Sequence, residues 1–251
     1  MAFCKVMIIG NLGRDPEMRY TPTGRPKDER YQSVLLAQDA VALIAALGEE
    51  RAYVVGHDWG ALATYGAAAL APERVRRIVT LAAAHPATLL GALATNYEMI
   101  KGGWHAYFFQ MPFAEQAVLA NDYEFVEKWW RDASPEYEIP REVMESVKGT
   151  FRQPGVVTAA INYYRHTMNP ANRDPTLAAL QEQVTTTPTP VPALALHGTK
   201  DRPGRLEAFE GMDQFFAAGL EKVILPGTGH FLHLERPGEV NAKIVEFLRH
   251  L

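Results

Sequence analysis

Hydrophobic residues form two kinds of stretch along this chain: short runs that are apolar at nearly every position, and longer stretches with helical spacing. Apolar residues three or four positions apart in residues 33–47 and 237–251 predict two amphipathic helices. An alanine-dense stretch at 61–70 predicts a third helix. The short apolar runs predict strands that are buried on both faces. The predicted strands cover residues 5–10, 51–56, 77–83, 191–196 and 222–225.

The order of these elements indicates a parallel sheet. A strand, a helix and a second strand follow one another through residues 51–83, which is typical of parallel strands covered by helices. Residues 86–188 differ, because they hold most of the tryptophan and show helical patterns without a strand. Since this stretch interrupts the series of strands, we expect it to form a helical lid over an active site. The predicted α/β core is residues 27–85 and 189–251.

Composition and charge narrow the class of protein. At 47% hydrophobic and 22% charged residues, the chain is typical of globular proteins. A net charge of −4 supplies no basic field, so nucleic acid is a disfavoured partner. The sequence shows no membrane-spanning apolar stretch and no signal pattern, and we expect a cytoplasmic protein with no membrane partner. Because Cys4 is the single cysteine, we expect no internal disulfide and no metal site built from several cysteines. We also expect no metal and no cofactor.

The clearest chemical motif is Gly56-His57-Asp58-Trp59-Gly60, where a predicted strand passes into a helix. Small residues on both sides of such a turn allow the central side chain to project from the edge of the sheet as a nucleophile. Here that side chain is Asp58. A carboxylate is ionised at neutral pH and needs no base to activate it. It suits attack on a saturated carbon, giving an alkyl ester that water must then cleave.

Two further residues stand after predicted strands. Asp201 follows strand 191–196 by five residues, and His230 follows strand 222–225. The order nucleophile, acid, histidine is the one that α/β-hydrolases use. His230 would activate water against the ester, and Asp201 would orient it. Each residue taken singly fits a helix cap or a structural histidine equally well, and His233 is the nearest alternative base.

Three stretches resemble the epoxide hydrolase branch of the α/β-hydrolases, which has haloalkane and haloacetate dehalogenases as relatives. The resemblance covers about residues 27–251 and implies a truncated α/β-hydrolase sheet with a helical lid, acting on a small apolar epoxide. It also implies that Trp59 lends its backbone N–H to the oxyanion hole and its indole to the pocket. Haloalkane dehalogenation is the second choice. A haloacetate dehalogenase would need arginines just after the nucleophile, where residues 61–63 supply none. The matching stretches are GHDWGA, HGTKD and PGTGHFLHLERPGEVNAKIVEFL.

Within that family, two lid tyrosines hold the epoxide oxygen as the ring opens. The Asn-Tyr-Tyr-Arg stretch at 162–165 makes Tyr164 the counterpart of one. The other aligns with His105, whose imidazole can donate a similar hydrogen bond. Tyr107, close by in sequence, is an alternative donor. Trp104 is expected beside them in the pocket, although Trp104 and Tyr107 could instead serve only to pack the lid.

The resemblance also implies more chain before the nucleophile than the 57 residues that precede Asp58. The missing part would include several strands and the His-Gly-x-Pro loop, which supplies a second oxyanion-hole N–H. We therefore expect residues 5–10 to pair at the edge left beside strand 51–56. We also expect weak or lost activity, unless residues 10–13 supply the missing donor.

Residues 1–26 resemble the opening of bacterial single-stranded DNA-binding proteins, so the chain looks like a chimera of two unrelated genes. Two alternatives to an enzyme follow. One is a single-stranded DNA-binding fragment, although such folds bind through a whole barrel with stacking aromatics, and Phe3 and Tyr20 are the only aromatic residues here. The other is an inactive remnant that forms a homo-oligomer through an exposed sheet edge.

Overall fold

The structure is a computed structural model that describes residues 5–9 and 31–249, with side chains described in the second range. The segment 1–26, which resembles single-stranded DNA-binding proteins, lies outside the described residues except for 5–9. Residues 10–13, considered above as a source of an oxyanion donor, also lie outside them.

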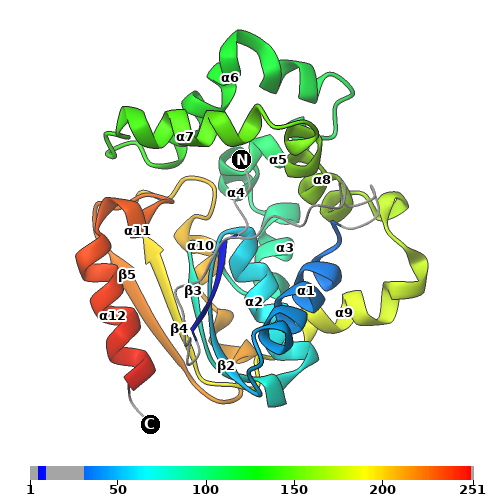
Figure 1. Ribbon diagram of the computed structural model, residues 1–251, viewed down its shortest axis with the longest axis vertical. Coiled ribbons are helices and arrows are strands. Elements are labelled where there is room, and N and C mark those ends of the chain that lie inside the picture. Colours follow the sequence, from blue (N-terminus) through cyan, green and yellow to red (C-terminus); the bar gives the residue numbers. More distant parts are fainter. Residues whose placement is uncertain (1–4, 10–30, 250–251) are drawn as a thin grey trace.

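A five-stranded sheet forms the centre of the molecule, with the strands in the order β1-β2-β3-β4-β5 (Figure 1). Strands β2 to β5 run parallel, which confirms the predicted α/β fold with a parallel sheet. Every predicted strand is present, with bounds shifted by a few residues at most. The strands are β1 (Lys5–Ile9), β2 (Ala52–His57), β3 (Val75–Leu81), β4 (Ala193–Gly198) and β5 (Leu220–Leu225).

Strand β1 pairs with β2 in the antiparallel direction, with Lys5 opposite His57 and Ile9 opposite Tyr53. The prediction that this segment pairs beside β2 is therefore confirmed. The pairing satisfies backbone groups of β2 that would otherwise form an open edge. The antiparallel direction places the start of β1 at the end of β2 next to Asp58, and the end of β1 at the opposite end.

Helices cover both faces of the sheet. Neighbouring strand residues point to opposite faces, so each strand contacts helices on both sides. Val54 and Ile78 pack with α1 and α2, whereas Val55 and Val79 pack with α12 (Figure 1). These strands are apolar on both faces because both faces are covered. The helices of this part are α1 (Ser33–Ala46), α2 (Trp59–Leu70), α10 (Leu206–Phe209), α11 (Leu232–Glu235) and α12 (Pro237–Arg249), with 3-10 turns at η1 (Pro72–Arg74) and η4 (Met212–Phe215).

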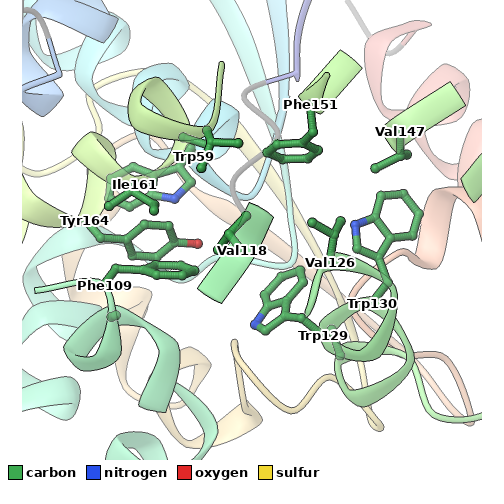
Figure 2. Packing of buried hydrophobic residues seen from close by; sticks show 14 of the residues in the cluster. Trp59, Phe109, Val118, Val126, Trp129, Trp130, Val147, Phe151, Ile161 and Tyr164 are labelled. Atoms are coloured by element: carbon green, nitrogen blue, oxygen red, sulfur yellow. The ribbon is translucent and has the colours of Figure 1, made fainter. Parts of the chain in front are cut away.

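The stretch predicted as a lid is helical and contains no strand. Its middle helices, α5 to α8, form an apolar cluster that includes Trp59 and Tyr164 and lies above the sheet (Figures 1 and 2). Three consecutive left-handed residues, 121–123, break α6 into two parts. The elements are α3 (Pro86–Thr95), α4 (Tyr97–Gly102), α5 (Trp104–Phe108), α6 (Ala114–Ala133), α7 (Arg141–Phe151), α8 (Val156–Met168), η2 (Pro170–Asn172), η3 (Pro175–Leu177) and α9 (Ala178–Thr186).

Helices α4 and α9, near the two ends of this stretch, pack on the core instead. Met99 of α4 belongs to the apolar cluster that α1 and α2 form with the sheet, and Val184 of α9 packs against Val34 of α1. The Gln183 side chain donates a hydrogen bond of 3.0 Å to the Ala69 carbonyl oxygen. Helices α5 to α8 therefore form the cap over the site, a smaller part than residues 86–188. No helix in the described part of the chain has the length and apolar character needed to cross a membrane.

Candidate active site

Asp58 lies at a sharp turn between β2 and α2, with φ 54° and ψ −120°. A residue other than glycine pays an energetic cost in this region, and such strained residues concentrate at functional sites. The turn is possible because its neighbours are small. A Cβ atom on Gly56 would lie 2.1 Å from the Gly60 carbonyl oxygen, so the backbone leaves no room for a side chain there. Helix α2 begins at once, and its first turn bonds to the Asp58 carbonyl oxygen through the Ala61 N–H at 2.9 Å.

Asp201 and His230 converge on Asp58 from the loops after β4 and β5. The His230 Nδ1–H lies 3.2 and 3.1 Å from the two carboxylate oxygens of Asp201. The other ring nitrogen, Nε2, lies 3.7 Å from Asp58 Oδ1 and has no hydrogen-bond partner in the described part of the chain. Asp201 is itself held by the Gly204 backbone N–H at 2.8 Å. His230, and not His233, therefore occupies the position between the two carboxylates.

The His230 loop is held by residues that the sequence did not single out. Its backbone N–H donates to the Ala133 carbonyl oxygen at 3.1 Å, and the Phe231 N–H donates to Ser134 Oγ at 3.0 Å. From the sheet side, His57 Nε2–H donates to the His230 carbonyl oxygen at 2.9 Å. The C-terminal end of α6 therefore anchors the histidine directly. No short motif marks Ala133 or Ser134, because their role depends on a contact with a loop about 100 residues later.

Burial and charge act in opposite directions on the three ionisable groups. Burial raises the pKa of Asp58 above its usual 3.8, although the His230 charge and the Trp59 backbone N–H lower it. For Asp201, burial raises the pKa, but the charge and hydrogen bond of His230 bring it below 3.8. For His230, burial lowers the pKa, but Asp201 and then Asp58 raise it above 6.5. The arrangement thus favours a charged histidine between carboxylates.

Tyr164 lies on the cap side of Asp58, with its ring 5.1 Å from the Trp59 ring and nearly perpendicular to it (Figure 2). Burial, followed by the nearby Asp58 charge, raises the pKa of Tyr164 well above its usual value. The hydroxyl therefore keeps its proton and can donate a hydrogen bond into the site.

His105 lies beside Tyr164, with ring centroids 5.2 Å apart. Burial lowers the pKa of His105 well below 6.5, so its ring is neutral at pH 7. Its Nδ1 atom is buried and has no partner among the described residues. A neutral imidazole carries one N–H, which makes His105 a candidate donor but not an acid.

Two residues expected at the site lie elsewhere. The Tyr107 hydroxyl donates to the Leu93 carbonyl oxygen, and Tyr107 does not line the cavity at Asp58. Trp104 also lies outside that cavity; it is 42% exposed and packs against Phe108 and Phe125. The reason is helical: in α5, His105 faces inward, so the residues one position before and two positions after it point to other sides of the helix.

Asp58, Trp59, His105, Tyr164 and His230 line one cavity of about 90 Å³ between the sheet and the cap. Most of the remaining wall is apolar, with leucines from α3 and Leu62 from α2. Within residues 5–9 and 31–249, no group of three histidine, cysteine or acidic side chains is arranged to hold a metal ion. A carboxylate, a paired histidine and two candidate donors thus meet in a small apolar space.

The sequence profile described as alpha/beta hydrolase fold matches residues 19–237. The chain belongs to the alpha/beta hydrolase fold family. The match begins inside segment 1–26, and the comparisons give no support to the resemblance to single-stranded DNA-binding proteins or to a chimera.

Several relatives of this hydrolase are named as epoxide hydrolases. It is 28% identical to epoxide hydrolase 3 of Xenopus tropicalis, over 88% of this chain and 59% of that protein. It is 26% identical to the AB hydrolase superfamily protein YfhM of Bacillus subtilis, over 93% of this chain and 79% of the relative. The chain therefore spans less than two thirds of the Xenopus protein.

A solved Bacillus megaterium epoxide hydrolase in complex with an inhibitor superimposes with a TM-score of 0.75. Its sequence identity is 22%, and the likeness covers 90% of this chain and 78% of that one. At this identity the likeness establishes the fold alone.

Proposed function

We propose that this hydrolase opens small epoxides through an ester formed on Asp58. One observation carries the proposal: a carboxylate at a nucleophile turn faces both an Asp201–His230 pair and the hydroxyl of Tyr164 across an apolar cavity. A serine hydrolase would need a base to activate its hydroxyl, whereas a carboxylate is a nucleophile as it stands. The relatives named as epoxide hydrolases agree with this reading.

In the first half-reaction, an Asp58 oxygen attacks a ring carbon, and the bond between that carbon and the epoxide oxygen breaks. The negative charge that develops on the epoxide oxygen is met by donors on the cap side, namely Tyr164 and neutral His105. Tyr164 keeps its proton in the resting site and can transfer it as the ring opens. The product of this step is a hydroxyalkyl ester of Asp58.

In the second half-reaction, His230 Nε2 takes a proton from water, and the hydroxide attacks the ester carbonyl carbon. Ester formation removes the Asp58 charge, which is one of the causes that raise the His230 pKa. A larger fraction of the histidine is therefore neutral, and able to accept a proton, once the ester has formed. Asp201 stabilises the imidazolium, which gives its proton to the alkyl oxygen as the ester bond to that oxygen breaks, and a diol leaves. The carboxylic acid left on Asp58 loses its proton, and Tyr164 regains one.

The Trp59 backbone N–H, which faces the Asp58 carboxyl, would hold the oxyanion of this second step. Acyl-transfer sites use two or more such donors, and the loss of one costs on the order of 10²–10³ in rate. We therefore propose that ester hydrolysis depends strongly on a second donor, which residues 10–13, outside the described residues, would have to supply. If they do not supply it, ester hydrolysis is the slow step and turnover is weak.

The test is to treat the protein with a small terminal epoxide and measure the mass of Asp58-containing peptides. We expect an adduct on Asp58 that persists, none in Asp58→Ala, and an unchanged yield in Asp132→Ala, which removes an exposed carboxylate. A 1-haloalkane of the same chain length serves as the comparison substrate. A protein that is neither labelled by the epoxide nor able to form diol, or Asp58→Ala that still forms diol, would rule out the proposal. Faster alkylation by the haloalkane would favour dehalogenation.

A further inference from the structure

A second cavity, of about 360 Å³, lies next to the one at Asp58 and is called the side cavity here. Its wall comes from the start of α1, the end of α8 and from α9, which gather on one side of the molecule (Figure 1). Leu90 and Thr167 belong to the walls of both cavities. These two side chains therefore lie between the side cavity and the space in which Asp58 would react.

The sizes of the two cavities suggest that they hold different parts of the substrate. Ligand sites usually enclose about 300–1,000 Å³, and the cavity at Asp58, at about 90 Å³, is smaller. It has room for an epoxide ring and a few carbons. A longer substituent must leave this space, and the side cavity is the larger space beside it.

The wall of the side cavity contains hydrogen-bonding groups without partners. Gln32 is 1% exposed, and its Oε1 accepts the Asp174 backbone N–H at 2.9 Å. That contact identifies the other terminal atom as the NH₂ group, which has no partner in the described part of the chain. The buried Thr167 hydroxyl also has none. Unpaired buried donors are costly, which suggests that a ligand satisfies them.

The charges in this wall favour an uncharged ligand. Arg173 donates through Nε to the His166 carbonyl oxygen and through Nη2 to that of Thr167, so backbone oxygens take up two of its N–H groups. Asp174 and Glu182 stand in the same wall and would repel an anion. The free Gln32 NH₂ group is suited to an ether or carbonyl oxygen.

We propose that the side cavity is a substrate subsite in which Gln32 donates a hydrogen bond to an ether or carbonyl oxygen of the epoxide's substituent. This inference rests on the proposed function and specifies its substrate class: epoxides that carry an uncharged oxygen several atoms from the ring. Thr167, at the boundary of the two cavities, contacts the chain that links the oxygen to the ring.

The experiment uses a series of terminal epoxides with equal chain length. In one member every chain atom is carbon, and in the others an ether oxygen replaces one methylene at successive positions. Ester formation on Asp58 and release of diol are measured for each member. We expect kcat/KM to rise about two- to tenfold for the oxygen position that reaches Gln32, as for one hydrogen bond to an unpaired donor.

Two variants test whether Gln32 causes the preference for ether substrates. Gln32→Met removes the donor and should reduce the ether-to-alkyl ratio of kcat/KM to about one. Gln32→Glu keeps an acceptor for the Asp174 N–H but replaces the NH₂ group by an oxygen, so it should bring the ratio below one and remains informative if Gln32→Met does not fold. Gln183→Met is the control, because this glutamine bonds to the Ala69 carbonyl oxygen and does not line the cavity. It should keep the wild-type ratio.

The outcomes separate the subsite from the chemistry. An active enzyme that treats every ether like its alkyl counterpart would overturn the subsite while leaving the proposed function intact. So would an ether preference that survives both Gln32 variants. If no epoxide alkylates Asp58, the proposed function fails, and the subsite fails with it.

Discussion

At the scale of single residues, the protonation of His230 depends on its buried neighbours Asp58 and Asp201. Asp201 and Asp58 both raise the pKa of His230, but only the charge of Asp58 disappears when an ester forms. The histidine is therefore charged in the resting site and less so in the intermediate, where it must accept a proton. This coupling needs no movement, because Nε2 already lies 3.7 Å from Asp58 Oδ1.

The pH dependence of ester hydrolysis tests this coupling. Neutral His230 is the base, so the rate should fall as pH drops through the His230 pKa of the ester intermediate. That pKa lies below the one in the resting site, because the Asp58 charge is gone while Asp201 still raises it. Asp201→Asn removes the largest cause that raises the pKa and leaves burial, which lowers it. The acid limb should thus move to lower pH while the maximal rate falls about 10²–10⁴-fold. Single-turnover hydrolysis of the adduct measures both, and an acid limb that stays in place would contradict the assignment of Asp201.

His105 allows a second test, of the donors on the cap side. His105→Phe should slow the alkylation of Asp58 about 10- to 100-fold, because a hydrogen bond to a developing charge is lost. His105→Tyr, which places a hydroxyl there, should remain within a few-fold of the wild-type rate. Burial holds the His105 pKa well below 6.5, so its contribution should not change between pH 6 and 8. If His105→Phe reacts as fast as the wild type, Tyr164 is sufficient by itself.

At the scale of elements, the turn between β2 and α2 requires glycine for close packing. In Gly56→Ala the added Cβ would meet the Gly60 carbonyl oxygen at 2.1 Å and Thr64 Oγ1 at 2.4 Å. Because the nearest atom is backbone, the turn itself must shift. We expect a loss of about 1–3 kcal/mol in the free energy of unfolding, as for overpacking in a core, together with loss of alkylation at Asp58.

Gly91→Ala is the matched control for that substitution. Gly91 lies inside α3, and a Cβ there would meet no atom within 4 Å. Alanine favours a helix over glycine by roughly 0.5–1 kcal/mol, so this variant should be as stable as the wild type or more so. Urea unfolding of the two variants measures the difference. Equal stability would show that the turn can relax.

At the scale of the whole molecule, β1 determines whether the sheet has an open edge at β2. Neighbouring N–H groups in a strand point to opposite sides, so one of Met7 and Ile8 directs its N–H toward β2 and the other directs it away. Proline should therefore be tolerated at one of these positions and lower the free energy of unfolding by about 1–3 kcal/mol at the other. Urea midpoints give the comparison, and equal effects would contradict the pairing.

The less stable proline variant also tests the expected homo-oligomer. If β1 protects β2 from pairing with another chain, its displacement should produce oligomers in size-exclusion chromatography, and the tolerated variant should not. Oligomers of the same size in the wild type and both variants would show that association does not use this edge.

The sequence alone determined the parallel sheet, the turn at Asp58 and the association of Asp201 and His230 with it. These follow from local patterns, since apolar runs specify buried strands, and residues that follow parallel strands meet at one edge of the sheet. Tyr164 and His105 were located by resemblance, and the structure brings both into the cavity at Asp58.

Only the tertiary structure decided the rest. The direction of β1 follows from backbone pairing, which leaves no mark in a run of five apolar or basic residues. Tyr107 and Trp104 lie outside the cavity because one turn of α5 aims its side chains in different directions. The anchoring of His230 by Ala133 and Ser134, and the side cavity at Gln32, join residues about 100 or more positions apart. Such contacts depend on how helices pack, and that packing is decided by the shapes of whole surfaces and not by any short motif.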